Sequence, residues 1–105
     1  MTPHVLHHKA QNELDDLVEH FLRIDPKVGI AFQARYQTHL SRIKDAPKLH
    51  RARKHGIRRV NLAPRYQEYF IAYIIVDDQI VIVAVGKGKR REYYFKDRVE
   101  AATNM

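Results

Sequence analysis

Two strongly apolar segments, separated by only two residues, restrict the fold of this chain more than any other feature. Residues 69–76 read YFIAYIIV, and residues 79–85 read QIVIVAV. Both are rich in β-branched and aromatic residues, which favour strands, and the polar pair Asp77-Asp78 between them has the length of a hairpin turn. Because residues 69–76 are apolar on both faces, the sequence predicts a β-hairpin whose first strand is central in its sheet.

The first 45 residues follow a different hydrophobic period. Apolar side chains recur there at steps of three and four residues, which is typical of one face of an α-helix. The two series are Ala10, Leu14, Leu17, Val18, Phe21 and Leu22, then Val28, Phe32, Tyr36, Leu40 and Ile43. Asp25 can cap the second helix, and Pro26 fits its first position because the N–H that proline lacks would be unpaired there. The short connection predicts an antiparallel helix hairpin that ends near Asp45.

Shorter segments complete the predicted fold. Residues 4–8 and 57–62 read as strands, and residues 93–95 as an edge strand. We therefore expect an α+β fold in which an N-terminal strand and the helix hairpin pack on a mainly antiparallel sheet of four to five strands. One domain spans residues 1–105, with a polar tail, helical or frayed, from about residue 98. The sheet face away from the helices is expected to serve in part as a binding surface.

The net charge of +7 is spread unevenly along the chain. Residues 1–43 hold as many acidic as basic side chains, so the whole excess lies in residues 44–105. This asymmetry favours a polyanionic partner, either nucleic acid or an acidic protein, over a plain solubility charge. No apolar segment approaches the roughly 20 residues of a membrane-spanning helix, and the N-terminus lacks the features of a signal peptide. We expect a cytoplasmic protein without a membrane partner.

The most basic segment follows directly after the second apolar run. Residues 83–95 read VAVGKGKRREYYF, so cations and aromatic side chains succeed the strand. Arginine and lysine donate hydrogen bonds to phosphate and carboxylate oxygens, which makes such a segment a candidate binding edge. With the earlier cations that flank the predicted strands, the candidate target- or phosphate-binding residues are Arg58, Arg59, Arg65, Lys87, Lys89, Arg90 and Arg91.

Neither a metal nor another cofactor is expected. The chain has no cysteine, which removes disulfides and cysteine-based zinc sites. His4, His7 and His8 lie close together in the sequence, but on a strand His7 and His8 would face opposite ways. The three histidines therefore do not predict a set of metal ligands.

Four segments, in this order and spacing, carry a resemblance to a known family. They are ELDDLVEHFLRIDPKVGIAF, GIRRVNL, YFIAYIIVDDQIVIVAV and KRREYYF, and the likeness covers about residues 3–98. The chain resembles toxins of the RelE/ParE superfamily of bacterial type II toxin–antitoxin systems, and most closely the ParE-like plasmid-stabilisation branch. The resemblance implies the same α+β fold, growth inhibition as the function, and a cognate acidic antitoxin as partner.

The resemblance also implies one of two targets. ParE-like members inhibit DNA gyrase, whereas RelE-like members enter the ribosome and cut messenger RNA. Where the RelE-like pattern has arginines, this chain has Phe70 and Gly88, although the late tyrosine is retained as Tyr94. In the functional loop of the ParE-like pattern, Lys87 stands in the place of a histidine, and the other positions are occupied by Lys89, Arg90, Tyr94 and Phe95. We therefore expect growth inhibition through gyrase.

Two alternatives stay open. A metal-independent, ribosome-dependent endoribonuclease of the RelE type would use Tyr94 and Arg90 as its catalytic residues. Such cleavage needs proton transfer and a stabilised charge on the attacked phosphate, and these are the roles that a tyrosine and an arginine can fill. The second alternative is a non-toxic module of the same fold that binds nucleic acid or a partner protein through these cations.

Overall fold

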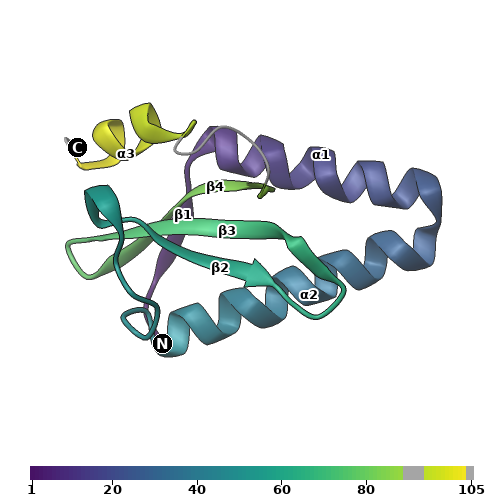
Figure 1. Ribbon diagram of the computed structural model, residues 1–105, viewed down its shortest axis with the longest axis horizontal. Coiled ribbons are helices and arrows are strands. Elements are labelled where there is room, and N and C mark those ends of the chain that lie inside the picture. The colour runs from purple at the N-terminus through teal and green to yellow at the C-terminus, as the bar shows by residue number, and fades with distance from the viewer. Residues whose placement is uncertain (89–93, 104–105) are drawn as a thin grey trace.

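The computed structural model describes residues 1–88 and 94–103 of the 105-residue chain. Its elements are β1 (His4–Leu6), α1 (His8–Ile24), α2 (Pro26–Asp45), a 3₁₀ turn (Lys54–Gly56), β2 (Arg58–Leu62), β3 (Tyr66–Val76), β4 (Gln79–Lys87) and α3 (Lys96–Thr103). Figure 1 shows the long hairpin of α1 and α2 beside the sheet, with α3 at the opposite end of the molecule from the tip of the hairpin. The predicted α+β class is confirmed.

A single residue ends the first helix and begins the second. The backbone N–H of Asp25 donates to Phe21 O at 3.0 Å, and its carboxylate accepts from the N–H of Lys27 at 2.9 Å. Pro26 occupies the first turn of α2. The helix boundary that Asp25 and Pro26 predict is therefore confirmed, and its cause is local. Within the described parts of the chain, no helix is long and apolar enough to cross a membrane.

The four strands of the described sheet lie in the order β1-β4-β3-β2. β1 runs parallel to β4, and the other neighbours are antiparallel. Asp77 and Asp78 join β3 to β4 with φ angles of 51° and 62°, a left-handed turn that aspartate tolerates better than most residues. The predicted hairpin is confirmed, and the parallel β1 makes the sheet mixed.

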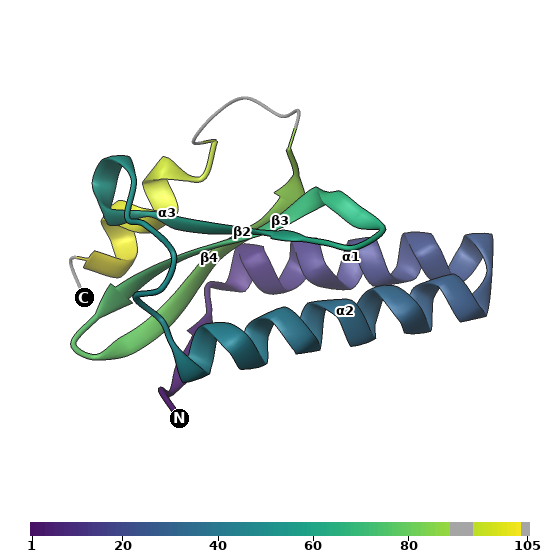
Figure 2. The same cartoon turned by 60° about the horizontal axis from the view of Figure 1, so that its bottom comes forward.

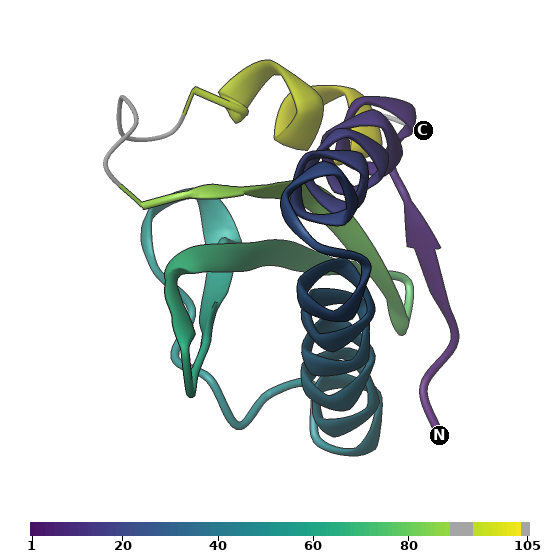
Figure 3. The same cartoon turned by 90° about the vertical axis from the view of Figure 1, so that its right-hand side faces the viewer.

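Both faces of the sheet are covered. Ile71, Tyr73 and Val85 point towards α1 and α2, in one core with the apolar stripes of both helices. The opposite side, here called the α3 face, carries Phe70, Ala72, Ile74, Val81, Val83 and Ala84. Figure 2 shows the strands between the helix hairpin and α3, and Figure 3, viewed along the hairpin, places α3 on the side of α1 rather than α2.

The covering of the α3 face narrows one expectation. Phe95, Val99 and Ala102 are buried against this face, so the binding surface expected there is confined to the part that α3 leaves uncovered. The segment from residue 98, expected to be a polar tail that is helical or frayed, is helical as far as Thr103 within α3. The apolar stripe of α3 is only a few residues long. The helix nevertheless joins the core, because Phe95 packs near Phe70, with ring centres 6.2 Å apart.

Two predicted strands differ from the structure at their ends. The first ends at Leu6 rather than residue 8, because the Nδ1 atom of His7 accepts from the N–H of Lys9 and caps α1. The rings of His7 and His8 consequently stack, 4.5 Å apart, instead of facing opposite ways. In the predicted edge strand at 93–95, Tyr94 and Phe95 form a turn that leads into α3, and Tyr93 lies outside the described residues.

Candidate functional site

Arg59 marks the start of the candidate site on the α3 face. Its guanidinium carbon lies 3.9 Å from the centre of the Phe70 ring, so the side chain reaches from β2 over β3. It extends as far as the end of β4, since a Cβ atom on Gly88 would lie 3.0 Å from Arg59 Nη2. Gly88 is also tied to β3, where its N–H donates to Glu68 O at 2.6 Å. Arg59 therefore places a positive charge beside the exit of the chain from β4.

Tyr94 lies over the same end of β4. A Cβ atom on Gly86 would be only 2.5 Å from the Tyr94 hydroxyl oxygen, so this close approach requires glycine. The hydroxyl donates to Oε2 of Glu13 at 2.9 Å. The ring also faces the guanidinium of Arg98, with 5.3 Å between the guanidinium carbon and the ring centre. Tyr94 is thus a contact between α3 and the rest of the fold.

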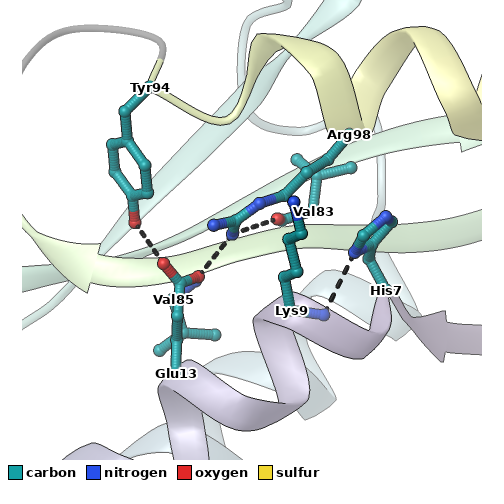
Figure 4. Close-up of polar contacts among 7 residues, drawn as sticks. All are labelled: His7, Lys9, Glu13, Val83, Val85, Tyr94 and Arg98. Carbon is teal, nitrogen blue, oxygen red and sulfur yellow. Dashed lines mark hydrogen bonds and ion pairs between the residues drawn. The ribbon is translucent and has the colours of Figure 1, made fainter.

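Glu13 and Arg98 together complete the outer edge of β4 (Figure 4). β1 ends at Leu6, so the following part of β4 has no strand partner on that side in the described sheet. The Oε1 atom of Glu13 accepts from the N–H of Val85 at 3.2 Å, and Arg98 donates to the carbonyl of Val83 at 3.1 Å. Side chains here satisfy backbone groups that another strand would otherwise pair.

The two side chains also form an ion pair. Arg98 Nη1 lies 2.7 Å from Glu13 Oε1, and the side chains are 13% and 16% exposed respectively. A charge-assisted hydrogen bond with so little access to water is stronger than an exposed pair. Through one carboxylate, α1 therefore holds both β4 and the C-terminal segment that carries Tyr94.

Sequence reasoning missed Glu13 and Arg98, although each had a signal. Glu13 follows the buried Ala10 by three residues and precedes Leu17 by four, which places a carboxylate on the buried side of α1. Arg98 precedes the buried Ala102 by four residues, which places it on the buried side of α3. A charged residue on an apolar helical stripe indicates a buried partner of opposite charge.

Arg58 points away from this site. It lies opposite Tyr73 in the sheet, whereas Arg59 lies opposite Ala72, so the two arginines point to opposite faces. The guanidinium of Arg58 donates to the backbone carbonyls of Lys48 and His50. Arg58 therefore fixes the loop between α2 and β2 and does not join Arg59 at the end of β4.

Lys87 and Arg65 occupy two further places. Lys87 lies opposite Tyr69, and its Nζ atom is 3.7 Å from Glu68 Oε2, with both side chains about half exposed. It lines a cavity of about 380 Å³ with residues of α1, among them Asp16 and His20. Arg65 is exposed in the turn between β2 and β3, with a φ of 76°.

The structure thus places the predicted site residues in different parts of the molecule. Arg59 and Tyr94 lie on the α3 face, and Lys87 lies on the side of α1. Three further predicted site residues fall outside the described residues, namely Lys89, Arg90 and Arg91. Over residues 1–88 and 94–103, no three acidic or histidine side chains are placed to share a metal ion. What the described site offers is positive charge and aromatic surface at the end of β4.

Comparison with solved structures defines the class of fold. The isolated toxin RelE of E. coli matches with a TM-score of 0.59 at 17% identity, over 97% of this chain and 99% of that one. A free arginine double mutant of the same toxin matches with a TM-score of 0.63 at 13% identity, over 96% of each chain. The chain has the RelE-like fold. No curated protein sequence gives a significant match.

Comparison with family models identifies the family. Residues 5–92 match the family described as the ParE toxin of the type II toxin–antitoxin system parDE. The chain therefore belongs to the ParE toxin family, within the RelE/ParE superfamily. This family membership confirms the resemblance seen in the sequence, and it implies a cognate antitoxin.

Proposed function

We propose that this ParE-family toxin arrests bacterial growth by inhibiting DNA gyrase in the cytoplasm. The observation that supports this proposal most is the set of side chains on the α3 face near the end of β4, together with their hydrogen bonds. RNA cleavage without a metal needs a group that transfers a proton and cations that stabilise the charge on the attacked phosphate. The hydroxyl of Tyr94 already donates to Glu13, and the described cation beside Phe70 and Gly88 is Arg59, which reaches there from β2. A mechanism based on binding fits these residues better than one based on cleavage.

The proposed target surface is the basic end of the sheet around β4. Lys87, the last residue of β4, is half exposed, Arg59 lies beside Gly88, and Arg65 is exposed in the turn that leads into β3. Lys89, Arg90 and Arg91 follow Gly88 directly in the chain. Arginine-rich surfaces of this kind bind acidic partners by charge-assisted hydrogen bonds and attract them over a distance.

A cognate acidic antitoxin is the proposed inhibitor. All of the excess positive charge lies in residues 44–105, so the surface that would bind gyrase would also attract an acidic polypeptide. Occupation of this surface by the antitoxin would exclude the target. The neighbouring open reading frame is the place to look for such a partner.

Regulated expression in bacteria tests the toxin itself. The chain should arrest growth when it is expressed alone, and co-expression of the adjacent small gene should restore growth. Continued growth at a confirmed level of folded protein would favour the non-toxic binding module instead.

The target is tested with purified components. We expect the toxin to block the supercoiling of relaxed plasmid by gyrase, and the double variant Arg90→Ala with Arg91→Ala to lose most of this inhibition. Arg23→Ala, an exposed cation at the tip of the helix hairpin, is the control and should inhibit normally. Messenger RNA cut in the ribosomal A site, together with unaffected supercoiling, would assign the chain to the endoribonuclease class.

A further inference from the structure

A second basic region lies at the junction of α2, β2 and the loop between them. A cavity of about 580 Å³ is bounded there by the end of α2, the loop and β2. A neighbouring cavity of about 690 Å³ is lined by residues 50–54 and Arg59. His50, Arg53 and Arg59 line both cavities, which therefore form one cleft, here called the α2–β2 cleft.

The loop that forms this cleft is held in place by hydrogen bonds to the sheet. The Tyr73 hydroxyl donates to Pro47 O at 2.7 Å, and Arg58 donates to the carbonyls of Lys48 and His50. The N–H of Arg53 donates to Ile57 O at 2.7 Å. These contacts fix the backbone of the loop before any ligand arrives, which lowers the entropy that binding would cost.

The cleft is strongly positive. Its basic lining residues, apart from histidines, are Arg42, Arg51, Arg53, Lys54 and Arg59, whereas Asp45 is the one acidic residue that lines it in the described chain. Burial, helped by His39 and Arg58, lowers the pKa of His50, so arginine and lysine carry the charge at neutral pH. Several arginines around one concave surface are suited to phosphate oxygens, which they bind in bidentate fashion.

We propose that the α2–β2 cleft binds the phosphate backbone of single-stranded nucleic acid. The concave shape favours a flexible strand, because a single strand can bend a phosphate and its sugar into the cleft. A duplex has a stiff outer surface that only protruding side chains reach. The exposed side chain of Leu49 also lines the cleft and offers apolar contact to a sugar or an unpaired base. This inference does not rest on gyrase as the target, and failure of the supercoiling assay would leave it standing.

The test is a binding titration with the full chain made by cell-free synthesis. The probes are fluorescent oligouridylate and oligothymidylate of about 12 nucleotides, within the usual size of a single-strand site, and a duplex of equal length. We expect both single strands to bind more tightly than the duplex, with affinity that falls steeply as salt is raised. The double variant Arg51→Gln with Arg53→Gln should weaken binding of the single strands about tenfold, and should lower the salt slope by about 1.4.

A matched variant separates the cleft from net charge. Arg23→Gln with Lys27→Gln removes two exposed cations at the tip of the helix hairpin, far from the cleft, and gives the same net charge as the cleft variant. We expect this control to bind within about twofold of the unmodified chain. Equal losses in the two double variants would overturn the proposal, as would tighter binding of the duplex or no binding at low salt. Unfolding curves of both variants confirm that the measured proteins are folded.

Discussion

In the described structure, the carboxylate of Glu13 connects three separate parts of the fold. Its carboxylate accepts hydrogen bonds from the Val85 backbone, from Tyr94 and from Arg98, and so it joins α1 to β4 and to the C-terminal segment. Removing one member of a poorly hydrated ion pair leaves the other charge without compensation. At the scale of residues, the stability of the α3 region should therefore depend on this one carboxylate.

The variant Glu13→Gln tests this dependence. The amide keeps the shape of the side chain but removes the charge opposite Arg98, so we expect the free energy of unfolding to fall by about 1.5–3 kcal/mol. Urea unfolding at neutral pH measures the change. The control Glu19→Gln removes a carboxylate whose partner, Arg23, is exposed, and should cost less than about 0.5 kcal/mol. Similar losses in the two variants would show that Glu13 behaves as a surface residue.

Gly86 provides a second test at this scale. Gly86→Ala would place a methyl group 2.5 Å from the Tyr94 hydroxyl oxygen, so the tyrosine must move. We expect destabilisation of about 1–3 kcal/mol, the usual cost of overpacking. In a Tyr94→Phe background the hydroxyl is absent, and the same substitution should cost clearly less. Equal costs in both backgrounds, measured as a double-mutant cycle, would contradict the close contact.

At the scale of elements, the helices and strands that can be predicted from the sequence are those whose formation depends on residues close together in the chain. The helix hairpin follows from a sustained hydrophobic period and from Asp25-Pro26, and the β-hairpin follows from two apolar runs around Asp77-Asp78. The role of α3 was not predictable, because its burial depends on the distant contact between Phe95 and Phe70. For the site, the alternation of side chains along a strand is enough to place Arg58 and Arg59 on opposite faces of β2, but no local pattern shows that Arg58 binds loop carbonyls.

The loop between α2 and β2 gives a prediction about pH. Burial, together with His39 and Arg58, lowers the pKa of His50 below its ordinary value of 6.5. The unfolded chain then binds a proton more readily than the folded one, so His50 contributes stability above about pH 6.5 that is lost as the pH falls through its folded pKa. Urea midpoints should decrease less between pH 7 and pH 5 in His50→Gln than in the unmodified chain.

Net positive charge is unevenly distributed along the chain, and this distribution should govern how fast the antitoxin binds. Residues 44–105 carry the entire charge of +7, so an acidic partner is drawn to one part of the fold and not to the tip of the helix hairpin. Long-range attraction acts mainly on the association rate and is screened by salt. We expect the association rate constant for the cognate antitoxin to fall about tenfold or more between low and high salt, with a smaller change in the dissociation rate.

Two variants of equal net charge make this prediction specific. Lys48→Gln with Lys54→Gln removes charge from the basic part, and Arg23→Gln with Lys27→Gln removes it from the tip of the hairpin. Stopped-flow mixing at low salt should show slower association for the first pair, and nearly unchanged association for the second. At high salt the two should converge, because screening removes the contribution that distinguishes them. If both pairs slow association equally at low salt, the net charge of the toxin directs the encounter and its distribution does not.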